Sequence, residues 1–247
     1  MPAPQNAPQQ APQPEPFTLE LGGAGRLRGD LLSGAEPTYL FVHGLGSMRK
    51  GEKSDSLLAH AKARGRAFLR VDQRGHGESS GRIGQVTIGE LIDDLMLLLD
   101  HLGPTVIVGS SLGGLVSAFA AAERPLLVRG LCLLAPALGF IGNLERLLDS
   151  EGRMRTNEGL CFEVEPRVID DARQLDERRL PQRLTIPTFV VHGTSDDVVP
   201  WQGSERFVAA IPHARKELWL VPGGDHRLNK YVAEIWTRFD RLVEGPA

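Results

Sequence analysis

Short apolar runs of strand length alternate with segments of helical period along most of this chain. The apolar runs occupy residues 38–42, 67–71, 105–108, 130–134, 188–191 and 217–221. The segments of helical period occupy residues 53–63, 88–102, 112–122, 204–210 and 228–243. Alternation of this kind is typical of a mostly parallel sheet that is covered by helices on both faces. The pattern therefore predicts an α/β fold.

Two further strands are expected near the N-terminal end. Residues 17–21 and 26–32 are joined by a glycine-rich stretch at 22–25, which predicts a hairpin and a sheet of about eight strands in all. Residues 139–187 break the alternation, because they separate two apolar runs that one helix would otherwise connect. We expect this stretch to be an inserted lid, small and helical.

The first sixteen residues differ in composition from the rest. Residues 1–16 are almost all Pro, Gln and Ala, and they contain neither a basic segment nor an apolar run. This composition predicts a disordered tail rather than a signal or transit peptide, so we expect a cytoplasmic location. The chain of 247 residues is 41% hydrophobic, which is enough for one folded domain at residues 17–247.

Charge and hydropathy exclude two classes of partner at this stage. The chain has 28 Lys and Arg against 31 Asp and Glu, whereas a nucleic-acid-binding protein needs a concentrated positive surface. The longest apolar runs are far shorter than the roughly 20 residues that span a bilayer. We expect neither nucleic acid nor membrane as a partner. The chain has only two cysteines, in unrelated segments, so we do not expect a disulfide framework.

The strongest chemical signal is the sequence GSSLG at residues 109–113. It follows an expected strand directly and precedes an expected helix, as does the sharp turn that raises a nucleophilic serine above the edge of a sheet. Side chains two residues before and after the nucleophile would collide in that turn, which accounts for Gly109 and Gly113. Ser111 is therefore the candidate nucleophile. Ser110 lacks glycines at these offsets, and we expect it to pack beside the turn.

A serine nucleophile needs a base that accepts its proton. We favour His226, which follows the last expected strand; the alternative is a histidine that caps the last helix. We expect His60, His101 and His213 to be exposed, on or just after helices. His192 ends a strand, where a structural hydrogen bond is the ordinary role.

The base in turn needs a carboxylate that orients it. Asp196 and Asp197 both follow the strand at 188–191, and we favour Asp196 because it comes first in the turn. Asp225 is adjacent to His226 in sequence, too close for the usual orienting geometry. These choices give the chain order serine, aspartate, histidine.

Attack on a carbonyl also requires two N–H donors for the developing oxyanion. We expect one to be the backbone N–H of Leu112, at the N-terminus of a helix. The other is expected from Leu45, in the sequence HGLG at 43–46. An ordinary strand-to-helix loop is the alternative interpretation of that stretch.

Four stretches, taken in order, resemble the α/β-hydrolase superfamily of serine hydrolases. They are HGLG at 43–46, DQRGHGES at 72–79, the turn around Ser111, and HGTSDDVVP at 192–200 with His226. The chain is most similar to the depalmitoylase and acyl-glucuronide esterase family and its bacterial relatives. The resemblance implies an α/β-hydrolase fold, a triad of Ser111, Asp196 and His226, and a structural role for Asp72 and His76.

These features together predict a serine esterase or thioesterase that forms an acyl-enzyme. The sequence has no clustered Cys and His ligands, phosphate-binding loop or dinucleotide fingerprint, so we expect neither metal nor organic cofactor. The expected partner is a small-molecule ester or acyl-thioester, and the oligomeric state is not predicted. Other chemistry on the same scaffold, namely C–C bond hydrolysis or perhydrolysis, is one alternative. A catalytically silent binding module is another.

An apolar acyl pocket is expected under the lid. The candidate lining residues are Met48, Phe140, Ile141, Leu144 and Met154. The alternative for each of them is an ordinary core contact of a small helical cap.

Overall fold

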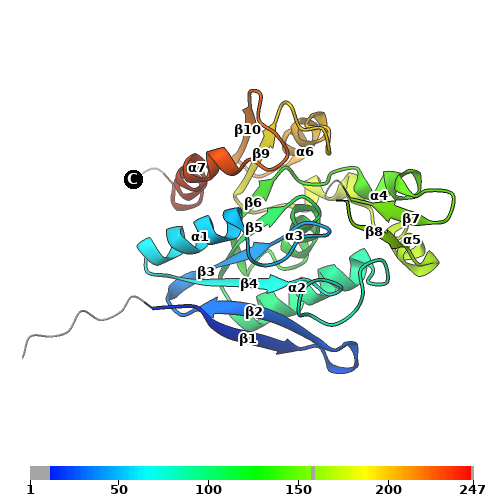
Figure 1. Cartoon of the computed structure of the whole chain (residues 1–247). Coiled ribbons are helices and arrows are strands. Elements are labelled where there is room, and N and C mark those ends of the chain that lie inside the picture. Colours follow the sequence, from blue (N-terminus) through cyan, green and yellow to red (C-terminus); the bar gives the residue numbers. More distant parts are fainter. Residues whose placement is uncertain (1–11, 157–158, 246–247) are drawn as a thin grey trace, which may run out of the picture.

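One sheet of eight strands lies at the centre of the part of the chain that the computed structural model describes, residues 12–156 and 159–245 (Figure 1). The strand order is β1-β2-β4-β3-β5-β6-β9-β10. The β1–β2 and β2–β4 pairs are antiparallel and all the other pairs are parallel, which confirms the expected mostly parallel sheet. The strands are β1 (Glu15–Glu20), β2 (Arg26–Leu32), β3 (Ala35–Val42), β4 (Arg66–Asp72), β5 (Thr105–Ser110), β6 (Val128–Leu134), β9 (Thr188–Gly193) and β10 (Lys216–Val221).

Helices cover both faces of the sheet, as Figure 1 shows. α1 (Glu52–Ala63) and α7 (Val232–Glu244) pack on one face. α2 (Ile88–Leu102), α3 (Leu112–Glu123) and α6 (Gln202–Ala210) pack on the other. The central strands are therefore shielded on both sides, and all six residues of β5 are buried, which explains the continuous apolar runs of the sequence.

Local signals account for the positions of several element ends. α2 begins after Thr87, whose side chain and that of Glu90 form a reciprocal capping box, and it ends before Gly103 at a φ of 73°. The last helix starts later than expected, because Asn229–Tyr231 form a 3-10 turn and α7 begins at Val232.

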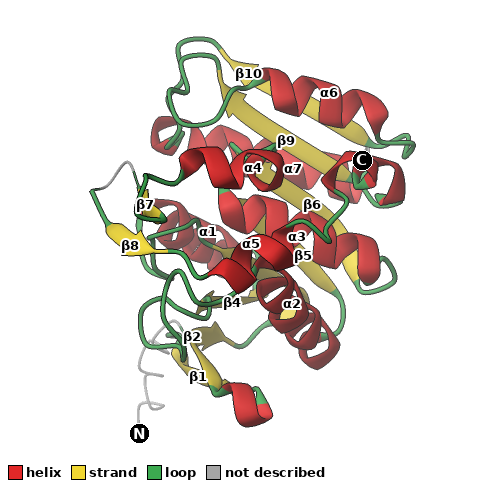
Figure 2. Ribbon diagram, turned by 90° about the vertical axis from the view of Figure 1, so that its right-hand side faces the viewer, coloured by secondary structure: helices red, strands yellow, loops and turns green. Residues whose placement is uncertain are grey.

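The lid contains helical segments, as expected, and also a two-stranded hairpin that the sequence did not predict. Its segments are α4 (Phe140–Asn143), η2 (Leu144–Leu147), β7 (Arg153–Arg155), β8 (Cys161–Glu163), α5 (Pro166–Ala172), η3 (Glu177–Arg179) and η4 (Pro181–Arg183). β7 and β8 are antiparallel, and Met154 pairs with Phe162. Exposed residues flank both side chains, which is the alternation of a half-buried strand. Figure 2 shows α4, α5 and this hairpin lying together on the side toward the viewer.

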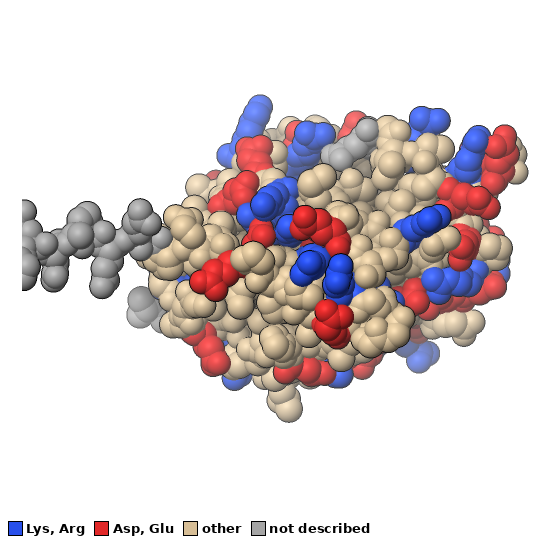
Figure 3. Space-filling model, turned by 60° about the horizontal axis from the view of Figure 1, so that its bottom comes forward, with Lys and Arg blue, Asp and Glu red and all other residues tan. Residues whose placement is uncertain are grey.

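The N-terminal hairpin is confirmed, but its boundary with the expected tail moves. β1 begins at Glu15, because Glu15 and Pro16 pair with Leu31 and Asp30 of β2. Residues 1–11 of the expected tail lie outside the described residues. Near β1 and β2, on the face shown in Figure 3, Lys and Arg side chains are interspersed with Asp and Glu. None of the described helices combines the length and the apolar character needed to cross a membrane.

Candidate active site

The sheet topology brings the loops that carry the candidate residues to one edge. β5, β6, β9 and β10 are neighbouring parallel strands, so their C-terminal ends lie side by side. Ser111 directly follows β5, Asp196 lies in the loop after β9, and His226 lies in the loop after β10. Open parallel sheets bind their ligands at this edge.

Ser111 occupies a strained turn between β5 and α3. Its φ and ψ are 55° and −120°, a conformation that residues other than glycine rarely adopt. A Cβ atom at Gly109 would lie 2.6 Å from the carbonyl oxygen of Gly113, and one at Gly113 would overlap the carbonyl oxygen of His43. The structure therefore confirms the steric reason for both glycines.

His226 is hydrogen-bonded to Asp196. The distance from His226 Nδ1 to Asp196 Oδ2 is 2.7 Å, and the side chains are 20% and 0% exposed respectively. Asp196 Oδ1 accepts the backbone N–H groups of Val198 and Val199, each at 2.8 Å. Asp197 is exposed, so the first aspartate of the turn is the one against the imidazole.

A second histidine holds the same carboxylate. His192 Nε2 lies 3.0 Å from Asp196 Oδ2 and 3.0 Å from the carbonyl oxygen of Val199, so it carries a proton and donates. Its Nδ1 accepts the Ser204 hydroxyl at 2.7 Å. The sequence predicted a structural hydrogen bond for His192 but not its partner. The only indication in the sequence of this contact was that Asp196 lies four residues after His192.

The surroundings of Asp196 keep its carboxylate ionised. Burial by itself raises the pKa of this group. Hydrogen bonds from His192, His226 and the Val199 N–H outweigh burial and hold the pKa of Asp196 well below its ordinary value. The carboxylate is therefore an acceptor for the imidazole of His226 across the pH range in which proteins are usually assayed.

The expected oxyanion donors flank the serine. A Cβ atom at Gly44 would lie 3.1 Å from Ser111 Cβ and 3.6 Å from Ser111 Oγ, so the turn at 43–46 lies directly beside the serine. Within the described ranges, the backbone N–H groups of Leu45 and Leu112 donate to no backbone carbonyl oxygen. Both residues line one cavity.

That cavity lies between the core and the lid, and its volume is about 40 Å³. Phe140, Leu144 and Met154 line it. Met48 does not; it is 59% exposed, and the preceding residue Ser47 is exposed as well. Ile141 lines a separate hollow between α4 and α6. The other lining residues are Leu45, Arg74, His76, Ile83, Gly84, Val86, Ile88, Leu91, Leu112, Phe162, Val164 and Val168.

One charged side chain, that of Arg74, borders this largely apolar space. The Arg74 Nε atom lies 2.5 Å from Asp94 Oδ2, and a second guanidinium N–H donates to the carbonyl oxygen of Glu90 at 2.8 Å. Burial raises the pKa of Asp94 to about 6, against the lowering effect of Arg74. Among the described residues, no group of three or more His, Cys, Asp or Glu side chains is arranged to hold a metal ion.

The remaining candidates have other roles. Asp225 Oδ1 accepts the backbone N–H of Leu228 at 3.0 Å and so caps the turn before α7. His60 was expected to be exposed but is half-buried, because its Nε2 lies 2.8 Å from Asp240 Oδ2. His213 is also half-buried, whereas His101 is exposed as expected.

The chain is similar to known proteins in both sequence and structure. A family model described as serine aminopeptidase, S33, matches residues 35–157 and 167–230. Mouse palmitoyl-protein thioesterase ABHD10, mitochondrial, is 30% identical over 213 residues, covering 81% of this chain and 72% of that protein. Rat monoglyceride lipase is 24% identical over 249 residues, covering 82% and 80%. The structure of mouse alpha/beta hydrolase domain-containing protein 10 matches with a TM-score of 0.82 at 27% identity, covering 93% and 98%.

Proposed function

This chain belongs to the α/β-hydrolase family described as serine aminopeptidase, S33, and on that premise we propose that it hydrolyses carboxylic esters or thioesters through Ser111. The observation that carries the proposal is the position of Ser111. It sits in a strained turn at the sheet edge where His226 is hydrogen-bonded to buried Asp196. Only β6 separates β5 from β9, so the strand ends that carry Ser111 and Asp196 lie about 10 Å apart.

The proposed reaction begins with His226 as general base. Its Nδ1–H donates to Asp196, which leaves Nε2 unprotonated and able to accept the Ser111 proton. The Ser111 oxygen then adds to the substrate carbonyl carbon. The backbone N–H groups of Leu45 and Leu112 stabilise the resulting oxyanion.

Collapse of this intermediate breaks the bond to the leaving group. His226 Nε2 returns the proton to the departing alkoxide or thiolate, and the acyl group stays on Ser111 as an ester. Water then attacks the acyl-enzyme, with His226 again as base. The carboxylic acid leaves, and the serine hydroxyl is restored.

The apolar lining of the cavity favours a substrate with an aliphatic acyl group. Phe140, Leu144 and Met154 bring apolar side chains of the lid to the space bordered by both proposed oxyanion donors. A cavity of about 40 Å³ has room for only a few water molecules, so only part of a long acyl chain fits within it. The relatives named palmitoyl-protein thioesterase and monoglyceride lipase support a fatty acyl substrate.

A substrate panel with an active-site probe tests the proposal. We expect hydrolysis of p-nitrophenyl esters and acyl-CoA thioesters, and labelling of Ser111 by a fluorophosphonate that Ser111→Ala abolishes. Activity confined to diketones would point instead to C–C bond hydrolysis, and an unlabelled, inactive chain to a binding module. An aminoacyl p-nitroanilide tests the activity that the family description names. The cytoplasmic location stays a prediction; the mouse relative's name describes that protein as mitochondrial.

A further inference from the structure

The turn that carries Leu45, residues 43–46 (here the oxyanion turn), is held by the turn after β4. The backbone N–H of Gly46 donates to His76 Nε2 at 3.0 Å. The backbone N–H of Gln73 donates to His43 Nε2 at 3.0 Å, and its side-chain amide donates to the His43 carbonyl oxygen at 2.6 Å. Both ends of the oxyanion turn are therefore tied down, with Leu45 between them.

These hydrogen bonds require one particular form of each imidazole. His76 Nδ1 lies 3.1 Å from the carbonyl oxygen of Arg74, so the ring proton sits there and Nε2 is the acceptor. His43 Nδ1 lies 2.8 Å from the carbonyl oxygen of Gly44, with the same consequence. Burial lowers the pKa of both histidines, that of His43 to about 4. Both rings are therefore neutral acceptors near neutral pH.

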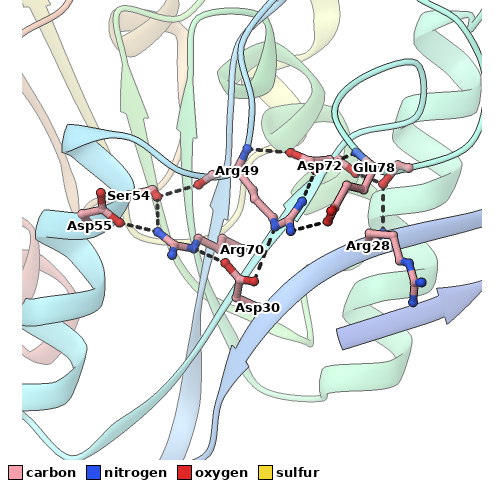
Figure 4. A network of polar contacts seen from close by, with 9 residues as sticks. Arg28, Asp30, Arg49, Ser54, Asp55, Arg70, Asp72 and Glu78 are labelled. Atoms are coloured by element: carbon pink, nitrogen blue, oxygen red, sulfur yellow. Dashed lines mark hydrogen bonds and ion pairs between the residues drawn. The ribbon is translucent and has the colours of Figure 1, made fainter. Parts of the chain in front are cut away.

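A buried carboxylate anchors the chain beyond the oxyanion turn. Asp72 Oδ1 accepts the backbone N–H of Arg49 at 2.7 Å, and Oδ2 accepts the backbone N–H of Glu78 at 3.0 Å. The Arg49 guanidinium also pairs with Asp72 and Glu78, as Figure 4 shows. Arg70 joins this network through Asp30 at 2.8 Å. The oxyanion turn therefore continues into a segment that is itself held against β4.

We propose that His76 and Gln73 are positioning residues, which fix the oxyanion turn so that the Leu45 N–H meets the developing oxyanion. The inference rests on the proposed function of this site. It follows from the hydrogen bonds that hold this turn and from its close packing beside Ser111, where a Cβ atom at Gly44 would lie only 3.1 Å from Ser111 Cβ. Both positioning side chains act through the backbone and touch no reacting atom.

Loss of a positioning side chain should lower kcat by less than complete loss of the Leu45 N–H donor would. Removing one oxyanion donor lowers kcat about 10²- to 10³-fold, so displacing it should lower kcat about 10- to 100-fold. A thionoester develops its charge on sulfur rather than oxygen, and it gains less from N–H donors placed for an oxyanion. The ratio of ester to thionoester turnover therefore reports on the donors rather than on general damage to the fold.

The experiment compares His76→Leu, His76→Gln and wild type on a matched ester and thionoester. We expect His76→Leu to lower kcat for the ester about 10- to 100-fold and for the thionoester less than about threefold. His76→Gln should recover most of the ester activity, because its side-chain oxygen can accept the Gly46 N–H. His60→Leu is the matched control, a histidine bound to Asp240, and should leave the ratio unchanged.

Two outcomes overturn the inference. Equal losses on ester and thionoester in His76→Leu would show that the histidine supports only the fold. Should His76→Leu fail to fold, Gln73→Met carries the same comparison, because it keeps the backbone N–H and removes only the side-chain amide. A wild-type chain that hydrolyses no ester and is not labelled at Ser111 overturns the proposed function and this inference with it.

Discussion

The substitution Asp196→Asn tests the proposed triad most directly, because the structure dictates how the new amide must lie. Oδ1 of the aspartate accepts two backbone N–H groups, from Val198 and Val199, and only the amide oxygen can replace it there. The amide NH₂ then occupies the position of Oδ2 and faces His226 Nδ1 at 2.7 Å. Two N–H groups cannot donate to each other.

The imidazole of His226 must therefore change tautomer. Its Nδ1 becomes the acceptor and its proton moves to Nε2, which can no longer take the Ser111 proton. We expect kcat/KM to fall about 10⁴-fold, which corresponds to about 5 kcal/mol of transition-state stabilisation. The fold should persist, because His192 Nε2 keeps the Val199 carbonyl oxygen as an acceptor at 3.0 Å.

The assay measures kcat/KM for p-nitrophenyl butyrate and an acyl-CoA thioester, with thermal unfolding as a check on the fold. Asp197→Asn is the matched control, since the neighbouring carboxylate is exposed, and it should retain wild-type activity. An Asp196→Asn enzyme within tenfold of wild type would refute the reasoning. So would a comparable loss in Asp197→Asn.

Three further predictions concern Gly113 beside Ser111, His43 of the oxyanion turn, and Leu144 of the lid. Gly113→Ala should destabilise the fold by more than about 2 kcal/mol in urea unfolding, because its Cβ would overlap the His43 carbonyl oxygen; Gly142→Ala, with open space, should be neutral. The pKa of His43 is about 4 in the folded chain and about 6.5 unfolded, so the unfolded state binds more protons and stability falls by about 3 kcal/mol as pH drops from 6.5 to 4. His43→Gln should lose that part of the pH dependence in unfolding at pH 7 and pH 4.5; an unchanged dependence would contradict the assignment. Leu144→Trp should fill the cavity and lower kcat/KM for long acyl esters more than for acetyl esters, whereas exposed Met48→Ala should change neither.

The strands of the main sheet and the strained turn at Ser111 could be predicted from the sequence because their signals are local. A buried parallel strand needs a continuous apolar run, and β5 shows one in the printed sequence as clearly as in the structure. The glycines around Ser111 are likewise required by atoms within a few residues or on the adjoining strand.

Short elements that depend on each other could not be located in this way. β7 and β8 have three residues each, and each is a strand only because the other pairs with it. β1 extends to Glu15 because Leu31 of β2 lies opposite. Met48 is exposed and does not line the cavity, although it is only three residues from Leu45 in the sequence.

The sequence alone determined which residue types stand at the ends of which strands, because the apolar runs give the position of each main strand in the chain. Tertiary structure decided how those residues are paired. In the folded chain, His226 and His192 both contact the carboxylate of Asp196. The backbone N–H of Gly46 donates to His76, which is thirty residues away in the sequence. Hydrogen bonds between separate loops depend on how the strands beneath them pack, and no local pattern encodes that distance or direction.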